Sequence, residues 1–242
     1  QYAALTSSQL AAVNVDNQAG LSESKIGSVP SDRVAAISTS VIAALNSKVL
    51  GGLTTAQVSA LTTVQLSALT TTNVRDLTAA QLNAIPNDRL SGLRAEVINA
   101  LSSVQVQGFS TAQVAQFGSA QVAGLNARNI AGLSSAHVVG INATAIAALD
   151  TAALASLTPL IFSRLTTSQF ANLTTDQLFA GTQLQWADVT TDQLRVIATS
   201  SMPYLHTHDV AVLSPDQIAA LTTAQVAAIT APCLLYTSDA AD

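Results

Sequence analysis

The stretch that decides the fold is Leu53–Ala60, LTTAQVSA, which returns almost unchanged at Leu221–Ala228 as LTTAQVAA. The same eight-residue pattern runs in one register from Leu5 to Ile229. Its first position is apolar in 28 of 29 occurrences, and Gly181 is the exception. A short period that lasts for almost the whole chain is typical of a solenoid, in which small repeats stack on one another.

Polar residues recur in the octad as regularly as the apolar ones. Counted from the leucine, position two is Ser, Thr, Asn or Asp in 23 of 29 octads, and position five is Gln in 13 of 28. Position six is apolar in 27 of 28, with Gln18 the exception. Ser or Thr followed three residues later by Gln is a capping box, in which the two residues satisfy each other's backbone N–H groups at a helix start. The pattern therefore predicts a new helix in nearly every octad.

Each helix must be short. Eight residues of a continuous α-helix turn through about 800°, so the leucines would drift by about 80° per octad and never form one apolar face. The next capping residue also follows the next leucine directly. We therefore expect helices of about seven residues, from position three to the next position one. Positions six and one, three residues apart, would share the buried face. Small residues at positions seven and eight would let neighbouring backbones approach closely.

The fold class that follows is an all-α solenoid with one very short helix per octad. A β-solenoid is the alternative, because short-period parallel β-solenoids also repeat Thr and apolar residues. In a strand, however, positions one and six would point to opposite faces. Ala and Gln are also poor strand formers, and capping boxes would have no purpose.

The register predicts a single solenoid domain over residues 1–230, irregular at 13–20 and 181–209. Residues 231–242 form a tail without the repeat. Within it, Cys233–Asp242, CLLYTSDAAD, resembles a translated sequencing adapter, which implies that the tail is an artefact and the native segment has no cysteine.

Composition excludes several classes of function. Only 10% of the 242 residues are charged and the net charge is −5, which argues against nucleic-acid binding because no basic patch is present. Mean hydropathy is +0.40, but no apolar run approaches the ~18 residues of a membrane span. The low charge predicts a surface inclined to lateral self-association. We find no catalytic motif, and capping explains the many Ser and Thr residues. We therefore expect no enzyme activity and no cofactor.

The two irregular stretches are the places to look for a site. In the first, Asp16 is the only carboxylate, so we expect no calcium site. The second holds the chain's only Trp and only Met. Both fall at position six and are expected in the core. It also holds Pro203, expected to break its helix into a kink or loop.

The same stretch contains the only candidates for metal ligands, His206, His208 and Asp209. In an extended segment the two histidines would share a side, whereas in the helical interpretation they diverge. His137 is distant, at position five, where it would replace a capping Gln. Zinc normally takes three or four protein ligands. We therefore expect a decayed repeat here, with no metal.

The octads of residues 5–230 resemble the LTTAQVAAL-type octapeptide arrays of large bacterial secreted and cell-surface proteins, some of adhesin or calcium-repeat-toxin type. The resemblance implies a rod or stalk segment located outside the cell or on its surface, and it brings no catalytic residues. A second hypothesis is a binding module whose regular Thr/Gln face meets a glycan, ice or a partner protein. A third is an enzyme centred on His206 and His208.

Overall fold

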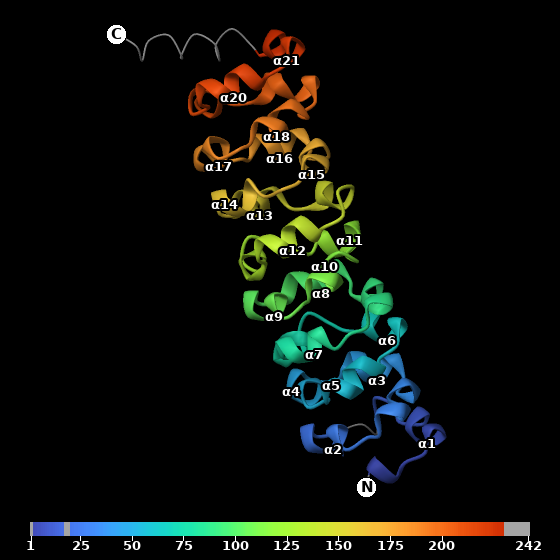
Figure 1. The fold of residues 1–242 in the computed structure, drawn as a ribbon. Coiled ribbons are helices and arrows are strands. Elements are labelled where there is room, and N and C mark those ends of the chain that lie inside the picture. Colours follow the sequence, from blue (N-terminus) through green and yellow to red (C-terminus); the bar gives the residue numbers. More distant parts are fainter. Residues whose placement is uncertain (1, 17–19, 230–242) are drawn as a thin grey trace.

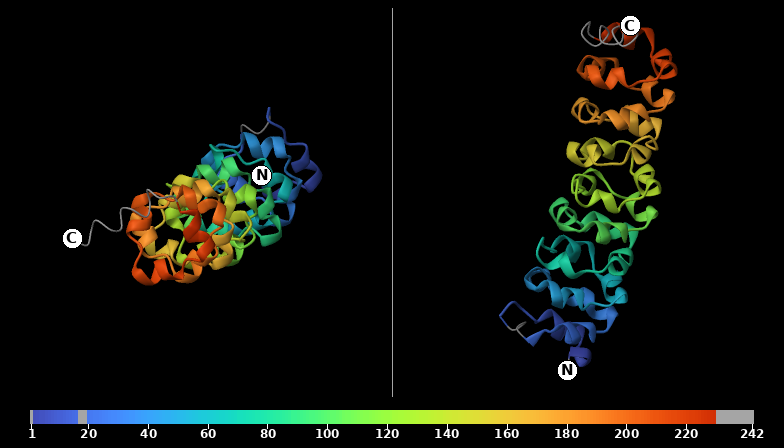
Figure 2. Two further views of the ribbon diagram at one scale, coloured as in Figure 1. Left: turned by 90° about the horizontal axis from the view of Figure 1, so that it is seen from above. Right: turned by 90° about the vertical axis from the view of Figure 1, so that its left-hand side faces the viewer.

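The computed structural model describes residues 2–16 and 20–229, and in these residues the chain is helical throughout and contains no strand. Its helices lie in layers that stack from the N-terminal to the C-terminal end of an elongated molecule (Figure 1, Figure 2). The expected all-α solenoid is confirmed, and the β-solenoid alternative is wrong. Gln18 and the adapter-like tail lie outside the described residues.

One turn of the solenoid takes three octads. Helix α5 (Thr55–Ala60) packs on α7 (Ala79–Asn83), and α7 packs on α9 (Ser103–Gln107). These helices begin at residues 55, 79 and 103, so stacked helices are 24 residues apart along the chain. The same spacing relates the other stacked helices, which therefore form three columns along the molecule.

The helices of each column follow in chain order, with 3₁₀ helices written η, and η1 (Tyr2–Ala4) precedes them all. The first column contains α1 (Ser7–Ala11), η3 (Ser31–Ala36), α5, α7, α9, η6 (Ile130–Gly132), α13 (Thr151–Ala155), α16 (Thr175–Phe179), η8 (Thr199–Tyr204) and α21 (Thr223–Ala228). The second contains α2 (Glu23–Gly27), α4 (Ser47–Gly51), η4 (Asn73–Asp76), α8 (Ala95–Ala100), α11 (Ser119–Val122), η7 (Ala145–Ala148), α15 (Thr167–Ala171), α18 (Thr191–Arg195) and α20 (Pro215–Ala220). The third contains α3 (Thr39–Ala44), α6 (Thr63–Ser67), η5 (Asn87–Gly92), α10 (Thr111–Val114), α12 (Ser135–Gly140), α14 (Pro159–Phe162), α17 (Gln183–Ala187) and α19 (Thr207–Ala211).

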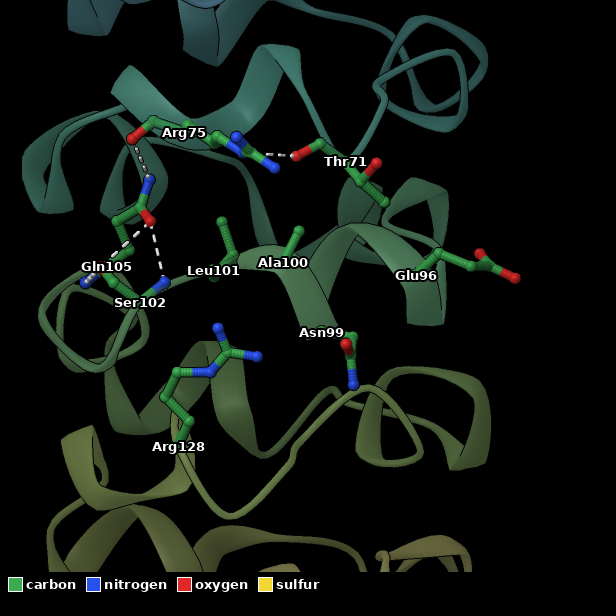
Figure 3. Close-up of a pocket in the computed structure, with 9 residues that line it drawn as sticks. All are labelled: Thr71, Arg75, Glu96, Asn99, Ala100, Leu101, Ser102, Gln105 and Arg128. Carbon is green, nitrogen blue, oxygen red and sulfur yellow. Dashed lines mark hydrogen bonds between the residues drawn. The ribbon is translucent and has the colours of Figure 1, made fainter.

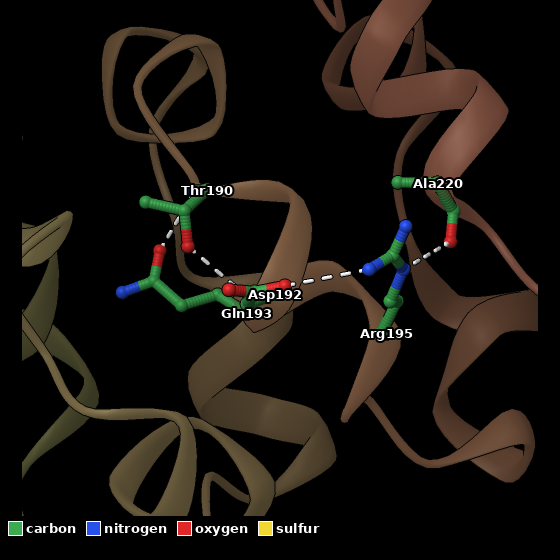
Figure 4. Close-up of polar contacts among 5 residues, drawn as sticks. All are labelled: Thr190, Asp192, Gln193, Arg195 and Ala220. Carbon is green, nitrogen blue, oxygen red and sulfur yellow. Dashed lines mark hydrogen bonds and ion pairs between the residues drawn. The ribbon is translucent and has the colours of Figure 1, made fainter.

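The capping boxes form as expected. At the start of α18, the Thr190 N–H donates to Gln193 Oε1 at 2.8 Å, and the Gln193 N–H donates to Thr190 Oγ1 at 3.2 Å (Figure 4). Wherever Gln stands at position five of a described octad, the helix is α; the 3₁₀ helices from η3 to η8 all have another residue there. The glutamine cap thus favours the wider α turn.

The helices are shorter than the seven residues expected, and none of those described exceeds six. At the end of α5, Leu61 has φ −60° and ψ 133°, and the following Thr62 has φ −75° and ψ 160°. Positions one and two are thus both extended. The two extended residues turn the chain from one column to the next. The leucine at position one therefore lies just after the helix and is not part of it.

Positions six and one line the interior, where they form one apolar core from Leu10 to Ile229. Val58 and Leu61 are 1% and 2% exposed, whereas Ile218 and Val226, position-six residues near the C-terminal end of the stack, are 37% and 40% exposed. Position-six residues thus lose burial at the C-terminal end, where no further turn covers them, as expected of a solenoid.

Close approach of backbones at position eight is also confirmed. A Cβ added to Gly108 would lie 2.5 Å from the Cα of Ala79, and one added to Gly124 would lie 2.5 Å from the carbonyl oxygen of Ala95. Any larger residue at these two positions would push apart turns that are now in contact.

The segment around Pro203 is helical, so the expected kink or loop is wrong. Pro203 lies inside η8, and the column continues from α16 through η8 to α21. Met202 holds the segment in place because its side chain is buried in the core, as expected for position six. The tighter 3₁₀ form, rather than a break, accompanies the proline.

Candidate functional site: the polar interior and the His206–Asp209 cluster

Position five of the octad holds the polar and charged residues of the interior. In the part of the chain that the structure describes, every buried polar or charged side chain stands at this position. Twelve of the sixteen are glutamines: Gln57, Gln65, Gln81, Gln105, Gln113, Gln121, Gln169, Gln177, Gln185, Gln193, Gln217 and Gln225. The others are Asn73, Asn129, Ser201 and Asp209.

Each interior glutamine links two turns. Gln57 accepts the N–H of its capping residue Thr54 on Oε1 at 2.7 Å. Its Nε2 donates to the carbonyls of Ile26 and Val29, at 2.8 and 2.6 Å, in the turn below. Buried backbone carbonyls need such partners. The capping box in the sequence predicts the first bond; the second depends on the 24-residue turn, which the octad pattern does not reveal.

Some octads without glutamine place another hydrogen-bonding side chain at position five. Asn73, one methylene shorter, accepts from its cap Thr70 and donates to the carbonyl of Ile42 at 3.0 Å. Arg89 donates to the carbonyls of Ser59 and Leu61 at 2.8 and 2.9 Å. Arginine offers no acceptor, but its octad has Pro86 at position two, which has no N–H to satisfy. Pro30 and Arg33 form the same combination at η3.

His137 takes over only the acceptor half of this role. Its Nδ1 accepts the N–H of the capping residue Ser134 at 3.1 Å. The prediction that His137 replaces a capping glutamine is therefore confirmed.

The octad that departs furthest carries His206, His208 and Asp209 at positions two, four and five. The rings of His206 and His208 stack with centroids 4.6 Å apart and an interplanar angle of 18°, and Phe179 lies 3.9 Å from His206 on centroids. The expectation that the two histidines diverge is wrong. His206 is the extended capping residue rather than a helical one, so its side chain folds back over the first turn toward His208.

Asp209 lies at the buried end of this cluster. Its Oδ2 accepts the N–H of His206 at 3.2 Å. Its Oδ1 lies 3.3 Å from Nε2 of His208, an ion-pair distance when the imidazole is protonated, but has no hydrogen-bond partner among the described residues. Burial raises the pKa of the Asp209 carboxyl above its ordinary value, and the neighbouring His208 opposes that rise. An ionised carboxylate also cannot donate to the turn below, as glutamine does.

Gly181, which replaces the apolar residue at position one of its octad, is explained by packing. Trp186 of the same octad is completely buried, as its position six predicts. A Cβ on Gly181 would lie 2.7 Å from the indole Nε1. The missing side chain at position one therefore makes room for the oversized one at position six, and Phe170 packs edge-on against the indole with centroids 6.4 Å apart.

A pocket of about 430 Å³ opens between η4, α8 and the chain that follows α11 (Figure 3). Arg75 and Arg128 line it from opposite sides of the turn that contains α8, which contributes Glu96. Arg75 donates through Nε to the carbonyl of Thr71 at 3.3 Å. The hydroxyl of Ser102, which also lines the pocket, caps α9 by accepting the N–H of Gln105.

The outer surface carries one short apolar strip. Leu160 and Leu184 stand at position four of octads one turn apart and are 63% and 71% exposed. Val139, in the helix below, lies beside Leu160. The strip is consistent with the expected tendency to associate.

Two segments of the chain, residues 34–71 and 202–232, match the ALTTAQ repeat family. In these two segments the octad corresponds to the ALTTAQ repeat. The match confirms the resemblance of the pattern to LTTAQ-type octapeptide arrays, and the second segment includes the His206–Asp209 octad. No curated protein matches the chain significantly. None of the helices described here has the length and apolarity to cross a membrane.

Proposed function

We propose that this array of ALTTAQ repeats is a structural and interaction segment, a rod or stalk, of a large bacterial surface or secreted protein, and that it performs no catalysis. The observation that carries the proposal is the use of the polar interior. The amides of Gln57, Gln65 and their equivalents are occupied by bonds between one turn and the next. The repeated glutamine side chains of the interior therefore serve to join successive turns of the stack.

The same bonds explain why such an array serves as a spacer. Every added turn contacts only its neighbours and repeats the same apolar and amide contacts, so length can grow without a new core design. The sparse charges and the apolar strip of Val139, Leu160 and Leu184 supply sites where parallel rods or partner proteins would meet.

A binding face built from Thr and Gln receives less support. The interior glutamines are buried and bonded, and the position-two hydroxyls accept helix N–H groups. Among the exposed threonines at the helix starts, those at position three, such as Thr55 and Thr111, take no part in capping. Any recognition of glycan or ice would have to use these alone.

Small-angle X-ray scattering tests the rod. With 24 residues per turn and the 8–10 Å typical of packed helices, residues 5–229 give a rod about 80–90 Å long. Its radius of gyration is then at least about 24 Å, against about 18 Å for a compact domain of this length. A value near 18 Å would refute the rod.

Location requires a separate experiment. Antibody labelling of intact cells of the bacterium that carries the gene, with and without permeabilisation, distinguishes surface from interior. Labelling of intact cells is expected. Signal only after permeabilisation, with none in the culture medium, would refute a surface or secreted role and leave the rod untouched.

A further inference from the structure

We propose that His206, His208 and Asp209 form a binding site for one zinc-like divalent transition-metal ion. The candidate ligand atoms of the three residues all lie within 4.8 Å of one another. They come from positions two, four and five of one octad and converge at the start of α19. The site goes beyond the rod function and does not depend on it.

The buried carboxylate of Asp209 is the observation that points to a bound cation. Asp209 is 1% exposed, and its Oδ1 has no hydrogen-bond partner among the described residues. The twelve buried glutamines at the equivalent position all lack charge and find partners for both ends of the amide, as Gln217 does one octad later. A buried carboxylate oxygen without a hydrogen-bond donor is unfavourable unless a proton, a protonated neighbour such as His208 or a metal cation neutralises it. Two imidazoles beside it supply the remaining ligands of a cation site.

The distances between the ligand atoms approach those of a tetrahedral ion, and the stacked rings of His206 and His208 must turn so that a nitrogen of each faces the metal. Ligands about 2.0–2.2 Å from zinc lie about 3.3–3.5 Å from one another. Nε2 of His208 and Oδ1 of Asp209 are already 3.3 Å apart. The widest pair must close by roughly 1.5 Å to reach tetrahedral spacing, and rotation of the half-exposed His208 can supply that movement.

The ligand set selects the class of metal. Two imidazole nitrogens and one carboxylate suit zinc, cobalt, nickel or copper, whereas calcium takes six to eight oxygen ligands. Three protein ligands leave a fourth position for water, as in open zinc sites. The half-exposed face of His208 places that position toward solvent.

Titration of the purified chain with Zn²⁺ by calorimetry, and with Co²⁺ by visible absorption, tests the site. One ion per chain is expected, with the absorption bands of tetrahedral cobalt and a melting temperature that rises with zinc concentration. The absence of saturable binding at one equivalent would overturn the proposal.

The repeat itself provides variants that should fold. Asp209→Gln and His206→Thr each restore the residue of regular octads and each remove one ligand, so each should weaken zinc binding at least about tenfold. His137→Gln removes a histidine outside the cluster and should leave the affinity unchanged. Equal affinity in the wild type and Asp209→Gln, or an equal loss in His137→Gln, would show scattered surface binding and refute the site.

Discussion

The octad that contains Thr54 and Gln57 and the octad that contains His206 and Asp209 have the same helical backbone. They differ in how the side chain at position five is hydrogen-bonded. In the first, the amide accepts from the cap and donates to two carbonyls below. In the second, the carboxyl accepts from the cap and leaves one buried oxygen unpaired. Val210 is nevertheless buried in the same core as Val58, so the apolar pattern persists where the polar one departs. The polar position can therefore diverge toward a new chemistry.

Gly181 and Trp186 show the same tolerance in the apolar core. The largest position-six residue and the smallest position-one residue occupy one octad, so their combined volume stays close to that of a regular pair. Cores tolerate such exchanges when total volume is conserved. The repeat therefore constrains the combined volume of the position-one and position-six side chains rather than the size of each one.

The largest expected effect comes from restoring the repeat at only one of these positions. Gly181→Leu should destabilise the surrounding turns by about 3 kcal/mol or more, because the new side chain has to enter space that the indole fills. Native-state hydrogen exchange of residues 173–197 measures the local loss. The double variant Gly181→Leu/Trp186→Val should recover most of it. Additive effects in the double variant would contradict the proposed exchange of volume.

Next in size is the loss of an interior glutamine. Gln177→Ala removes the acceptor for the Thr174 N–H and the donor to the carbonyls of Ile146 and Leu149. We expect a cost of about 2–4 kcal/mol, because buried groups are left unpaired and a cavity forms. Gln9 is the matched control: it is exposed, lies in the first turn and caps Thr6.

For Gln9→Ala the expected cost is only about 1 kcal/mol, that of a lost cap. The comparison uses the hydrogen-exchange protection of each variant's own octad, since a long repeat array does not unfold as one unit. Similar losses at both positions would mean that the bonds to the turn below contribute nothing.

The octad pattern reveals the layout of one repeat and little about the relation between repeats. Helix starts, the buried pair and the core roles of Trp186 and Met202 follow from local periodicity and capping chemistry. The three-octad turn does not, because it is set by the extended angles at positions one and two and by the core volume that the columns enclose. The second role of Gln57, and the contact between His206 and His208, depend on this three-dimensional arrangement and were missed.

One signal was readable in the sequence. Both prolines at position two, Pro30 and Pro86, are followed at position five by an arginine, and physical chemistry explains the combination. Proline has no N–H to donate, so the partner needs only donors. Comparing the octads with one another would have indicated that position five donates to something other than the cap.

Substitutions at Pro86 and Arg89 test whether the two positions depend on each other. Pro86→Thr alone leaves a cap N–H without an acceptor, and Arg89→Gln alone buries an Oε1 without a donor. Each should cost about 1–2 kcal/mol. The double variant recreates a regular capping box, so we expect a favourable coupling of about 1–2 kcal/mol in a double-mutant cycle. Additivity within about 0.5 kcal/mol would show that the two positions act independently.

The smallest effect bears directly on the opening comparison. In metal-free protein at neutral pH, Asp209→Gln should stabilise its octad by about 1 kcal/mol, because it removes a buried charge and supplies the missing donor. His137→Gln should change stability by about 0.5 kcal/mol or less, since His137 is only partly buried and already caps its helix. Hydrogen exchange of residues 206–213 and 134–141 measures both. Added zinc should then reverse the order of wild type and Asp209→Gln, because only the wild type gains stability from the ion. If Asp209→Gln were destabilising without metal, the carboxyl would have a partner within the fold, and the octad would be a regular one in which aspartate has simply replaced glutamine.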